Sequence, residues 1–234
     1  RIVRCNARTY KRARIPPGQT LKADKMDFTA ARKAMVDSQV RVNDVTDRRI
    51  HAAMLATPRE AFCAPDRAFA AYADGAVEIA GDRKLMPARD VAKLLQAAEA
   101  HEGETALAIA APYAAAVLAR MGLKVTAQEA DQAVFDVAGP ALAAEGVETA
   151  VAPLDQPVGA GWDLIVCEGG VVSAPEAWGA ALRPGGRLVV VERRNAVGKA
   201  ALYVKGREGV SRRELFDSTP AMLAALTPAP TFAL

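Results

Sequence analysis

The fold is decided by Thr105-Ala106-Leu107-Ala108-Ile109-Ala110-Ala111-Pro112-Tyr113-Ala114-Ala115-Ala116-Val117-Leu118-Ala119, followed by Lys124-Val125-Thr126-Ala127-Gln128-Glu129. This stretch predicts a strand, a tight turn, a helix and a second strand, with an acidic residue about 20 positions after the turn. Doubly wound α/β domains hold a nucleotide-like cofactor with this layout. The turn reads Ala110-Ala111-Pro112, where such domains carry glycines. The scaffold therefore predicts a cofactor-binding fold, and the turn argues against a close fit of that cofactor.

The remainder of the carboxyl-terminal half alternates between strand and helix patterns. We expect strands at 105–110, 124–128, 148–152, 163–167 and 187–191, and helices at 112–121, 131–145 and 175–182. The strands at 163–167 and 187–191 are continuously apolar, as in central parallel strands covered on both faces. Segments 200–205 and 230–234 are expected to be a final pair of strands, with a charged helix or loop between them. The fold class is therefore α/β, with a doubly wound, mostly parallel seven-stranded sheet.

The amino-terminal part has a different organisation. Helices are predicted at 28–38, 46–56 and 88–100, because apolar residues recur there at helical spacing. Between the second and third helices we expect a loop region with short extended pieces. The sequence thus predicts a helical and loop subdomain over residues 26–100, followed by a Rossmann-like domain over residues 101–234.

Composition limits the class of protein. The chain has 234 residues, 51% of them hydrophobic, which suits one domain or one domain with a small addition. No run of about 18 uncharged apolar residues occurs, so we expect no membrane span and no membrane partner. Cys5, Cys63 and Cys167 lie far apart, and the only histidines are His51 and His101. We therefore expect no disulfide framework, no metal site and a reducing, cytoplasmic location.

The positive charge is concentrated at the amino terminus. Residues 1–25 carry a net charge of +7, and the remaining chain carries −4. Three interpretations compete: a nucleic-acid-binding arm, an Arg-rich targeting peptide, or a non-native or disordered segment upstream of a start at Met26. The third is favoured, because the sequence opens on Arg and an organised helix follows Met26. A nucleic-acid partner is accordingly not expected.

Several phrases in order resemble one family. The amino-terminal signature of that family is similar to three segments of this chain: Met35-Val36-Asp37-Ser38-Gln39-Val40, Pro58-Arg59-Glu60-Ala61-Phe62 and Ala71-Tyr72-Ala73-Asp74. Its fourth strand and following turn resemble Trp162-Asp163-Leu164-Ile165-Val166 and Leu182-Arg183-Pro184-Gly185-Gly186-Arg187-Leu188-Val189. From Met26 to the carboxyl end, the chain is similar to the protein-L-isoaspartate O-methyltransferases, which have a Rossmann-like methyltransferase fold.

The resemblance implies a function. It implies methylation of the free α-carboxylate of L-isoaspartyl residues, with S-adenosylmethionine as cofactor and damaged proteins or peptides as partners, by a monomer. It also assigns cofactor contacts to the turn at Ala110 and Tyr113, to Glu129 for the ribose hydroxyls, and to Asp155 near the adenine amino group. The local alternatives are a solvated carboxylate at Glu129 and a simple turn residue at Asp155.

The resemblance also exposes three departures. The cofactor turn is two residues shorter than the family's and has no glycine. Leu85 stands where the family has its active-site serine, so no catalytic residue is assigned. Leu154-Asp155-Gln156 replaces a Gly-Asp-Gly beside the adenine pocket. Tyr72 and Asp74 are candidates for the peptide groove, or else serve local packing and turn capping.

Two features near the predicted sheet edge, Cys167 and Gly169-Gly170, have simpler interpretations. Cys167 is expected to be an inert buried cysteine, because Glu168 follows it and no cation is nearby in sequence. Gly169-Gly170 could open the backbone and so compensate for the missing glycines.

Two hypotheses follow: an active repair enzyme, or a degenerate member, weak or inactive, that keeps the fold as a binding or regulatory module. The second is favoured, because the cofactor turn lacks the glycines that let the backbone adopt positive φ and let a ligand approach.

Overall fold

The computed structural model describes residues 27–227. The basic segment 1–25 and the strand expected at 230–234 lie outside the described residues. Within the described part of the chain, no helix has both the length and the apolar character needed to cross a membrane.

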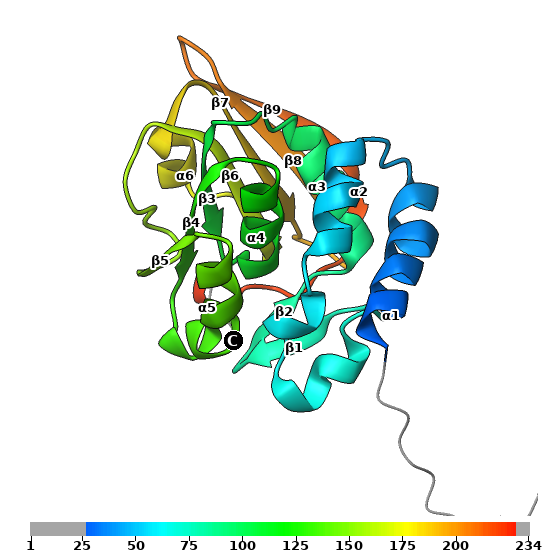
Figure 1. Cartoon of the computed structure of the whole chain (residues 1–234). Helices are drawn as coiled ribbons and strands as arrows, with labels where there is room; N and C mark the ends of the chain where they lie inside the picture. The colour runs from blue at the N-terminus through cyan, green and yellow to red at the C-terminus, as the bar shows by residue number, and fades with distance from the viewer. Residues whose placement is uncertain (1–26, 228–234) are drawn as a thin grey trace, which may run out of the picture.

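A seven-stranded sheet forms the centre of the molecule (Figure 1). Its strand order is β5-β4-β3-β6-β7-β8-β9, and the first five of these strands are parallel. The sheet therefore confirms the predicted α/β class and the mostly parallel arrangement. The bounds are β3 (Thr105–Ile109), β4 (Lys124–Glu129), β5 (Glu148–Val151), β6 (Trp162–Val171), β7 (Leu182–Glu192), β8 (Gly198–Lys205) and β9 (Val210–Ser218).

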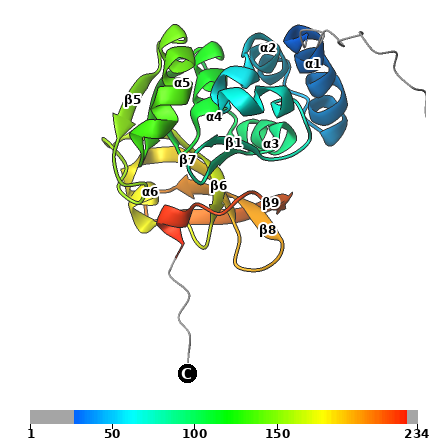
Figure 2. The ribbon, with the colours of Figure 1, turned by 90° about the horizontal axis from the view of Figure 1, so that it is seen from below.

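Helices cover both faces of this sheet unequally. Helices α1 to α5 lie on one face and α6 lies on the other (Figure 2). Their bounds are α1 (Phe28–Met35), α2 (Arg48–Ala56), α3 (Ala88–Ala98), α4 (Pro112–Arg120), α5 (Gln132–Ala144) and α6 (Glu176–Ala181). Helix α4 is buried along almost its whole length. Its small alanine side chains let it sit between the sheet and the neighbouring helices α2 and α5.

Capping side chains mark where the amino-terminal helices begin, and the first helix continues as other helical turns. Asp27 caps α1 by accepting hydrogen bonds from the next residues, and Asp47 caps α2 in the same way. Helix α1 ends at Met35, before the predicted end at residue 38, but helical structure continues past that point as a π-helical turn (Val36–Val40) and a 3₁₀ turn (Arg41–Asn43). One hydrophobic core joins these helices to the sheet, so this part of the chain packs directly on the strands.

A small β-hairpin connects the helices to the sheet edge. After 3₁₀ turns at Arg59–Phe62 and Pro65–Ala70, strands β1 (Val77–Ala80) and β2 (Arg83–Leu85) pair antiparallel. Two strands alone are marginally stable, so the hairpin depends on packing. Its inward side chains are buried in the main core. In Figure 1 the hairpin lies at the lower edge of the sheet, where the parallel strands end.

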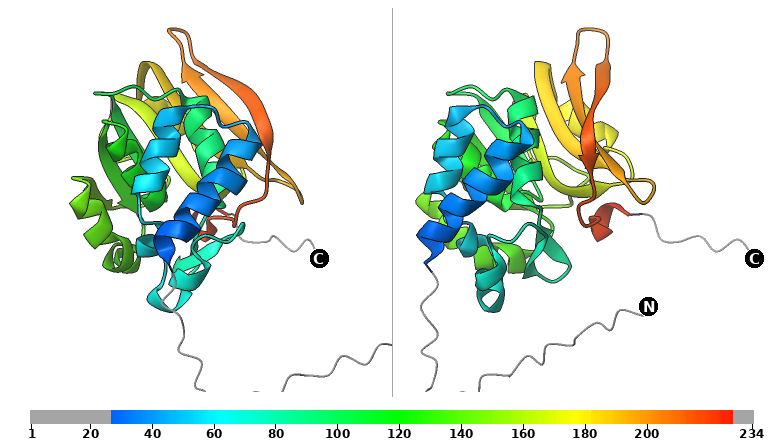
Figure 3. Two further views of the ribbon diagram at one scale, coloured as in Figure 1. Left: turned by 45° about the vertical axis from the view of Figure 1, so that its right-hand side comes forward. Right: turned by 90° about the vertical axis from the view of Figure 1, so that its right-hand side faces the viewer.

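The last strand differs from the prediction. A charged helix or loop was expected after residue 205, but Val210–Ser218 forms β9, which pairs antiparallel with β8. Figure 3 shows these two strands as a long hairpin at one end of the sheet. Because β9 is an edge strand with mostly exposed side chains, it lacks the apolar alternation by which strands are recognised.

Candidate functional site

The predicted cofactor site consists of the turn after β3, from Ala110 to Tyr113, and Glu129 at the end of β4. Ala110 has a φ of +51°, in the left-handed region where a β-carbon costs about 1–2 kcal/mol. Its amide donates to the Gln128 carbonyl at 2.8 Å, so the turn stays tied to β4. Ala110 and Ala111 are both fully buried. Their methyl groups are therefore packed, and the turn presents no bare backbone to a ligand.

Glu129 is paired with an arginine from the hairpin. Its side chain is 1% exposed and forms a bidentate pair with Arg83: Nε to Oε2 at 3.1 Å and Nη2 to Oε1 at 3.2 Å. Arg83 Nη2 also donates to the Ala110 carbonyl at 2.5 Å. Burial raises the pKa of Glu129, and Arg83 opposes that shift. The carboxylate to which the resemblance gives the ribose hydroxyls thus already holds a protein cation.

A second buried cluster lies at the start of α4. Glu168 lies within β6 and accepts a hydrogen bond from the Ala114 amide at 2.5 Å. The positive end of the α4 dipole therefore faces a carboxylate from the protein itself. Complete burial raises the pKa of Glu168 to about 7.

Arg59 and Tyr113 complete this cluster. The Arg59 guanidinium lies 4.7 Å from the centre of the Tyr113 ring, and both side chains are fully buried. Arg59 donates to the Ala71 carbonyl at 2.8 Å and to the Met86 carbonyl at 2.6 Å. The sequence does not identify Arg59, Arg83 and Glu168 as residues of the candidate site, because no spacing pattern connects them.

Leu85 lies in β2 and is completely buried in the hydrophobic core. A leucine side chain has no hydrogen-bonding group, so this position cannot orient a polar substrate. The position that the resemblance gives to a serine is therefore part of the packing beneath the hairpin.

The two candidates for a peptide groove take part in ion-pair networks. The Tyr72 hydroxyl accepts a hydrogen bond from Arg32 Nε at 2.8 Å and donates to Glu60. Asp74 pairs with Arg89 at 2.9 Å. The structure places Asp74 on the surface and Tyr72 between α1 and the 3₁₀ turns. Their role in substrate binding stays a prediction.

The other predicted contact, Asp155, is exposed. No hydrogen bond from its side chain is found among residues 27–227. The neighbouring Leu154 is buried, and its carbonyl accepts a hydrogen bond from the Trp178 indole at 2.8 Å. The structure does not bring the Asp155 carboxylate together with Glu129 through any described interaction.

The glycine pair after Glu168 receives the carboxyl-terminal segment. The Gly170 amide donates to the Ala221 carbonyl at 2.8 Å, and the Leu223 amide donates to the Gly170 carbonyl at 2.9 Å. Gly169 has a φ of +153°, and a β-carbon there would lie 2.7 Å from the Leu223 side chain. The space that these glycines leave is therefore filled by protein, and it does not open the sheet edge.

The remaining reactive side chains are placed as follows. Cys167 is fully buried, and burial raises the pKa of its thiol. Nε2 of His51 lies 2.8 Å from the Val45 carbonyl, and His101 is exposed in a loop. Across residues 27–227, no three His, Cys, Asp or Glu side chains are grouped to hold a metal ion.

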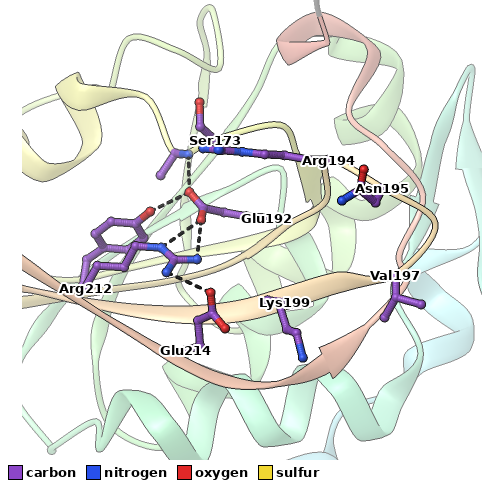
Figure 4. Close-up of a pocket in the computed structure, with 10 residues that line it drawn as sticks. Ser173, Glu192, Arg194, Asn195, Val197, Lys199, Arg212 and Glu214 are labelled. Atoms are coloured by element: carbon purple, nitrogen blue, oxygen red, sulfur yellow. Dashed lines mark hydrogen bonds and ion pairs between the residues drawn. The ribbon is translucent and has the colours of Figure 1, made fainter.

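An open cavity lies beyond the carboxyl end of β7. It has a volume of about 550 Å³ (Figure 4). Glu192 lies at its base and is bound by Tyr203, Arg212 and the Ala174 amide. None of the predicted site residues lines it; the lining residues are Ser173, Ala174, Glu192, Arg194, Asn195, Val197, Lys199, Tyr203, Arg212 and Glu214.

Comparison with solved structures gives the class. A Plasmodium falciparum chain, described as a protein-L-isoaspartate O-methyltransferase in complex with S-adenosyl-L-homocysteine, matches with a TM-score of 0.70 and 16% identity. The match covers 83% of this chain and 98% of that one. Another structure of a protein-L-isoaspartate O-methyltransferase matches with a TM-score of 0.67 and 19% identity, over 85% of this chain and 67% of the other. The fold is that of a methyltransferase of the doubly wound α/β class.

Comparison of sequences gives the family. The family model described as protein-L-isoaspartate(D-aspartate) O-methyltransferase matches residues 30–216. A protein-L-isoaspartate O-methyltransferase of Methylorubrum extorquens is 36% identical over 206 residues, covering 86% of this chain and 90% of the relative. One from Rhodopseudomonas palustris is 35% identical over 185 residues, covering 76% and 74%. The chain belongs to the protein-L-isoaspartate O-methyltransferase family.

At the position that the resemblance gives to the cofactor, the structure has protein side chains. The turn carries two buried methyl groups, each Glu129 carboxylate oxygen accepts a hydrogen bond from Arg83, and Glu168 accepts one from the first turn of α4. A ligand at this position would have to displace side chains that are themselves buried and hydrogen-bonded.

Proposed function

We propose that this protein is a degenerate member of the protein-L-isoaspartate O-methyltransferase family that binds S-adenosylmethionine weakly or not at all. It keeps the family fold as a binding or regulatory module. The observation that carries the proposal is the buried Arg83–Glu129 pair, in which a protein side chain takes the carboxylate assigned to the cofactor.

The chemistry at the acceptor position supports the same proposal. Leu85 is buried and offers no polar group, so no residue there can orient an isoaspartyl carboxylate. The charged side chains near the cofactor turn, Arg59 and Glu168, are buried and hydrogen-bonded to protein atoms, although Arg59 Nη1 and Glu168 Oε2 have no partner among the described residues. Weak binding and weak transfer are therefore expected together.

Calorimetry on the full chain tests the proposal. S-adenosyl-L-homocysteine is titrated up to millimolar concentration, with the Methylorubrum extorquens relative measured alongside as a matched comparison. We expect no saturable heat from this chain, and no transfer of labelled methyl groups to an isoaspartyl peptide above the background. Leu85→Ser alone should not restore transfer, because the cofactor site stays closed.

The second candidate function is active repair, in which isoaspartyl carboxylates of damaged proteins are methylated. The match over 86% of this chain and 90% of a relative that carries the enzyme's name favours it. Tight binding of S-adenosyl-L-homocysteine by the unaltered chain, together with methyl transfer to the peptide, would establish this function and refute the first.

A further inference from the structure

Arg83 lies on the β1–β2 hairpin, and its side chain reaches the end of β4. Its guanidinium makes three hydrogen bonds there, two to the Glu129 carboxylate and one to the Ala110 carbonyl. A guanidinium is a planar fork whose two parallel N–H groups match the two oxygens of a carboxylate. Arg83 thus joins the strand end and the cofactor turn with one rigid group.

The same pattern of donors belongs to a class of small molecules. A vicinal diol, such as the ribose of an adenosyl compound, offers two neighbouring O–H donors to one carboxylate. We infer that Arg83 is an internal lock, which occupies the place of such a diol on Glu129 until the hairpin carries it away. This inference rests on the proposed function, in which the cofactor site is closed.

The two sides of this contact are held differently, because the hairpin is attached by side-chain packing and is not paired to the seven-stranded sheet. The hairpin consists of two short strands with an irregular register between Glu78 and Ala80. Glu129, by contrast, ends a strand that is paired on both sides within the seven-stranded sheet. Because the sheet fixes Glu129, release of its carboxylate requires movement of Arg83 and therefore of β2.

Burial makes the lock effective. The two side chains are 11% and 1% exposed, so water screens their attraction poorly. A neutral diol must replace this charged pair, and it must also leave Arg83 with a new partner or with water. The unaltered chain therefore strongly disfavours the ligand, and removal of the guanidinium should reveal the affinity that the remaining site retains.

The test replaces the guanidinium and measures binding directly. Arg83→Met keeps the length and apolar volume of the side chain but donates no hydrogen bond. Calorimetry with S-adenosyl-L-homocysteine should show binding at least about tenfold tighter than that of the unaltered chain, which corresponds to about 1.4 kcal/mol. The variant should bind adenosine more tightly than 2′-deoxyadenosine, because only adenosine supplies both hydroxyls.

Two further variants control the result. Arg67→Met removes an exposed pair with Glu78 on the same hairpin, and it should leave binding unchanged. Arg83→Met combined with Glu129→Gln should lose the gain, because the charged acceptor of the diol is absent. Arg83→Lys keeps a cation without the fork, should give an intermediate gain, and serves if the methionine variant does not fold.

The outcomes separate the lock from the proposed function. If Arg83→Met and Arg83→Lys fold, as shown by circular dichroism, and bind within about twofold of the unaltered chain, the lock is wrong. The weak binding of the unaltered chain would then still support the proposed function. If the unaltered chain and Arg83→Met both bind S-adenosyl-L-homocysteine tightly, both ideas are overturned.

Discussion

Two arginine–glutamate pairs lie on opposite sides of β6, and they behave differently. Arg83–Glu129 is almost completely buried, whereas the Arg212 side chain that pairs with Glu192 is 36% exposed and borders the open cavity. Burial raises the pKa of Glu129 despite its partner. Burial also acts to raise the pKa of Glu192, but hydrogen bonds from Tyr203, the Ala174 amide and Arg212 lower it overall.

The difference shows what burial does to an ion pair at a sheet edge. On the β3–β4 side, the paired charges are buried, and their desolvation must be offset by geometry. On the β7–β8 side, the charges remain beside solvent and leave a hollow of about 550 Å³. The sheet edge thus has one side filled by protein and one side open.

The largest expected effect comes from breaking the buried pair. Glu129→Ala leaves the Arg83 guanidinium without its carboxylate, and the free energy of unfolding should fall by about 3–5 kcal/mol. Glu214→Ala, which removes an exposed partner of Arg212, should cost less than about 1 kcal/mol. Urea unfolding of both variants measures the contrast. Equal losses would mean that burial does not distinguish the two sides.

An intermediate effect is expected from pH at Glu168. Because its pKa rises from 4.5 to about 7 in the folded state, the folded chain binds this proton more tightly than the unfolded chain does. The stability that this provides is present in full below about pH 4.5 and is lost as the pH rises through about 7.

Glu168→Gln tests this pH dependence. The glutamine oxygen can still accept the Ala114 hydrogen bond and carries no charge. Relative to the unaltered chain, the variant should gain roughly 1–3 kcal/mol at pH 8 and little at pH 5. Urea unfolding at several pH values measures this difference. A difference that is the same at pH 5 and pH 8 would contradict a titrating carboxyl at this position.

The smallest expected effect has the opposite sign and comes from the open side. The pKa of Glu192 is lowered, so its contribution to stability is present above about 4.5 and is lost as the pH falls. Glu192→Gln should therefore cost about 1 kcal/mol near neutral pH and almost nothing in acid. Acid unfolding curves of the two chains should converge. Curves that stay parallel would remove the contrast with Glu168.

The order of strands and helices could be predicted from sequence because it is encoded locally. The apolar runs within β6 and β7 mark covered parallel strands, and the alanine-rich segment after Ala110 marks a closely packed helix. Helix ends also follow from single residues such as Asp47. Strand β9 escaped prediction because an exposed edge strand has no apolar face to display.

Some features of the candidate site could likewise be predicted from the sequence, and others could not. The sequence showed that the turn lacks glycine and that Leu85 replaces a serine, because both are properties of single positions. It did not reveal that Arg83 reaches Glu129, because 46 residues separate the two and no spacing rule joins them. Arg59 stands in a phrase that resembles the family signature, but neither the phrase nor the sequence around Glu168 shows that the two side chains meet at the start of α4.

The sequence by itself determined the α/β order, the family resemblance and the absence of bare backbone in the cofactor turn. Each of these depends on residue types within a short window. Only the tertiary structure decided that Arg83 meets Glu129 and that Glu168 meets the start of α4. Burial and pairing of charges depend on which distant segments the fold brings together, and no local pattern specifies that.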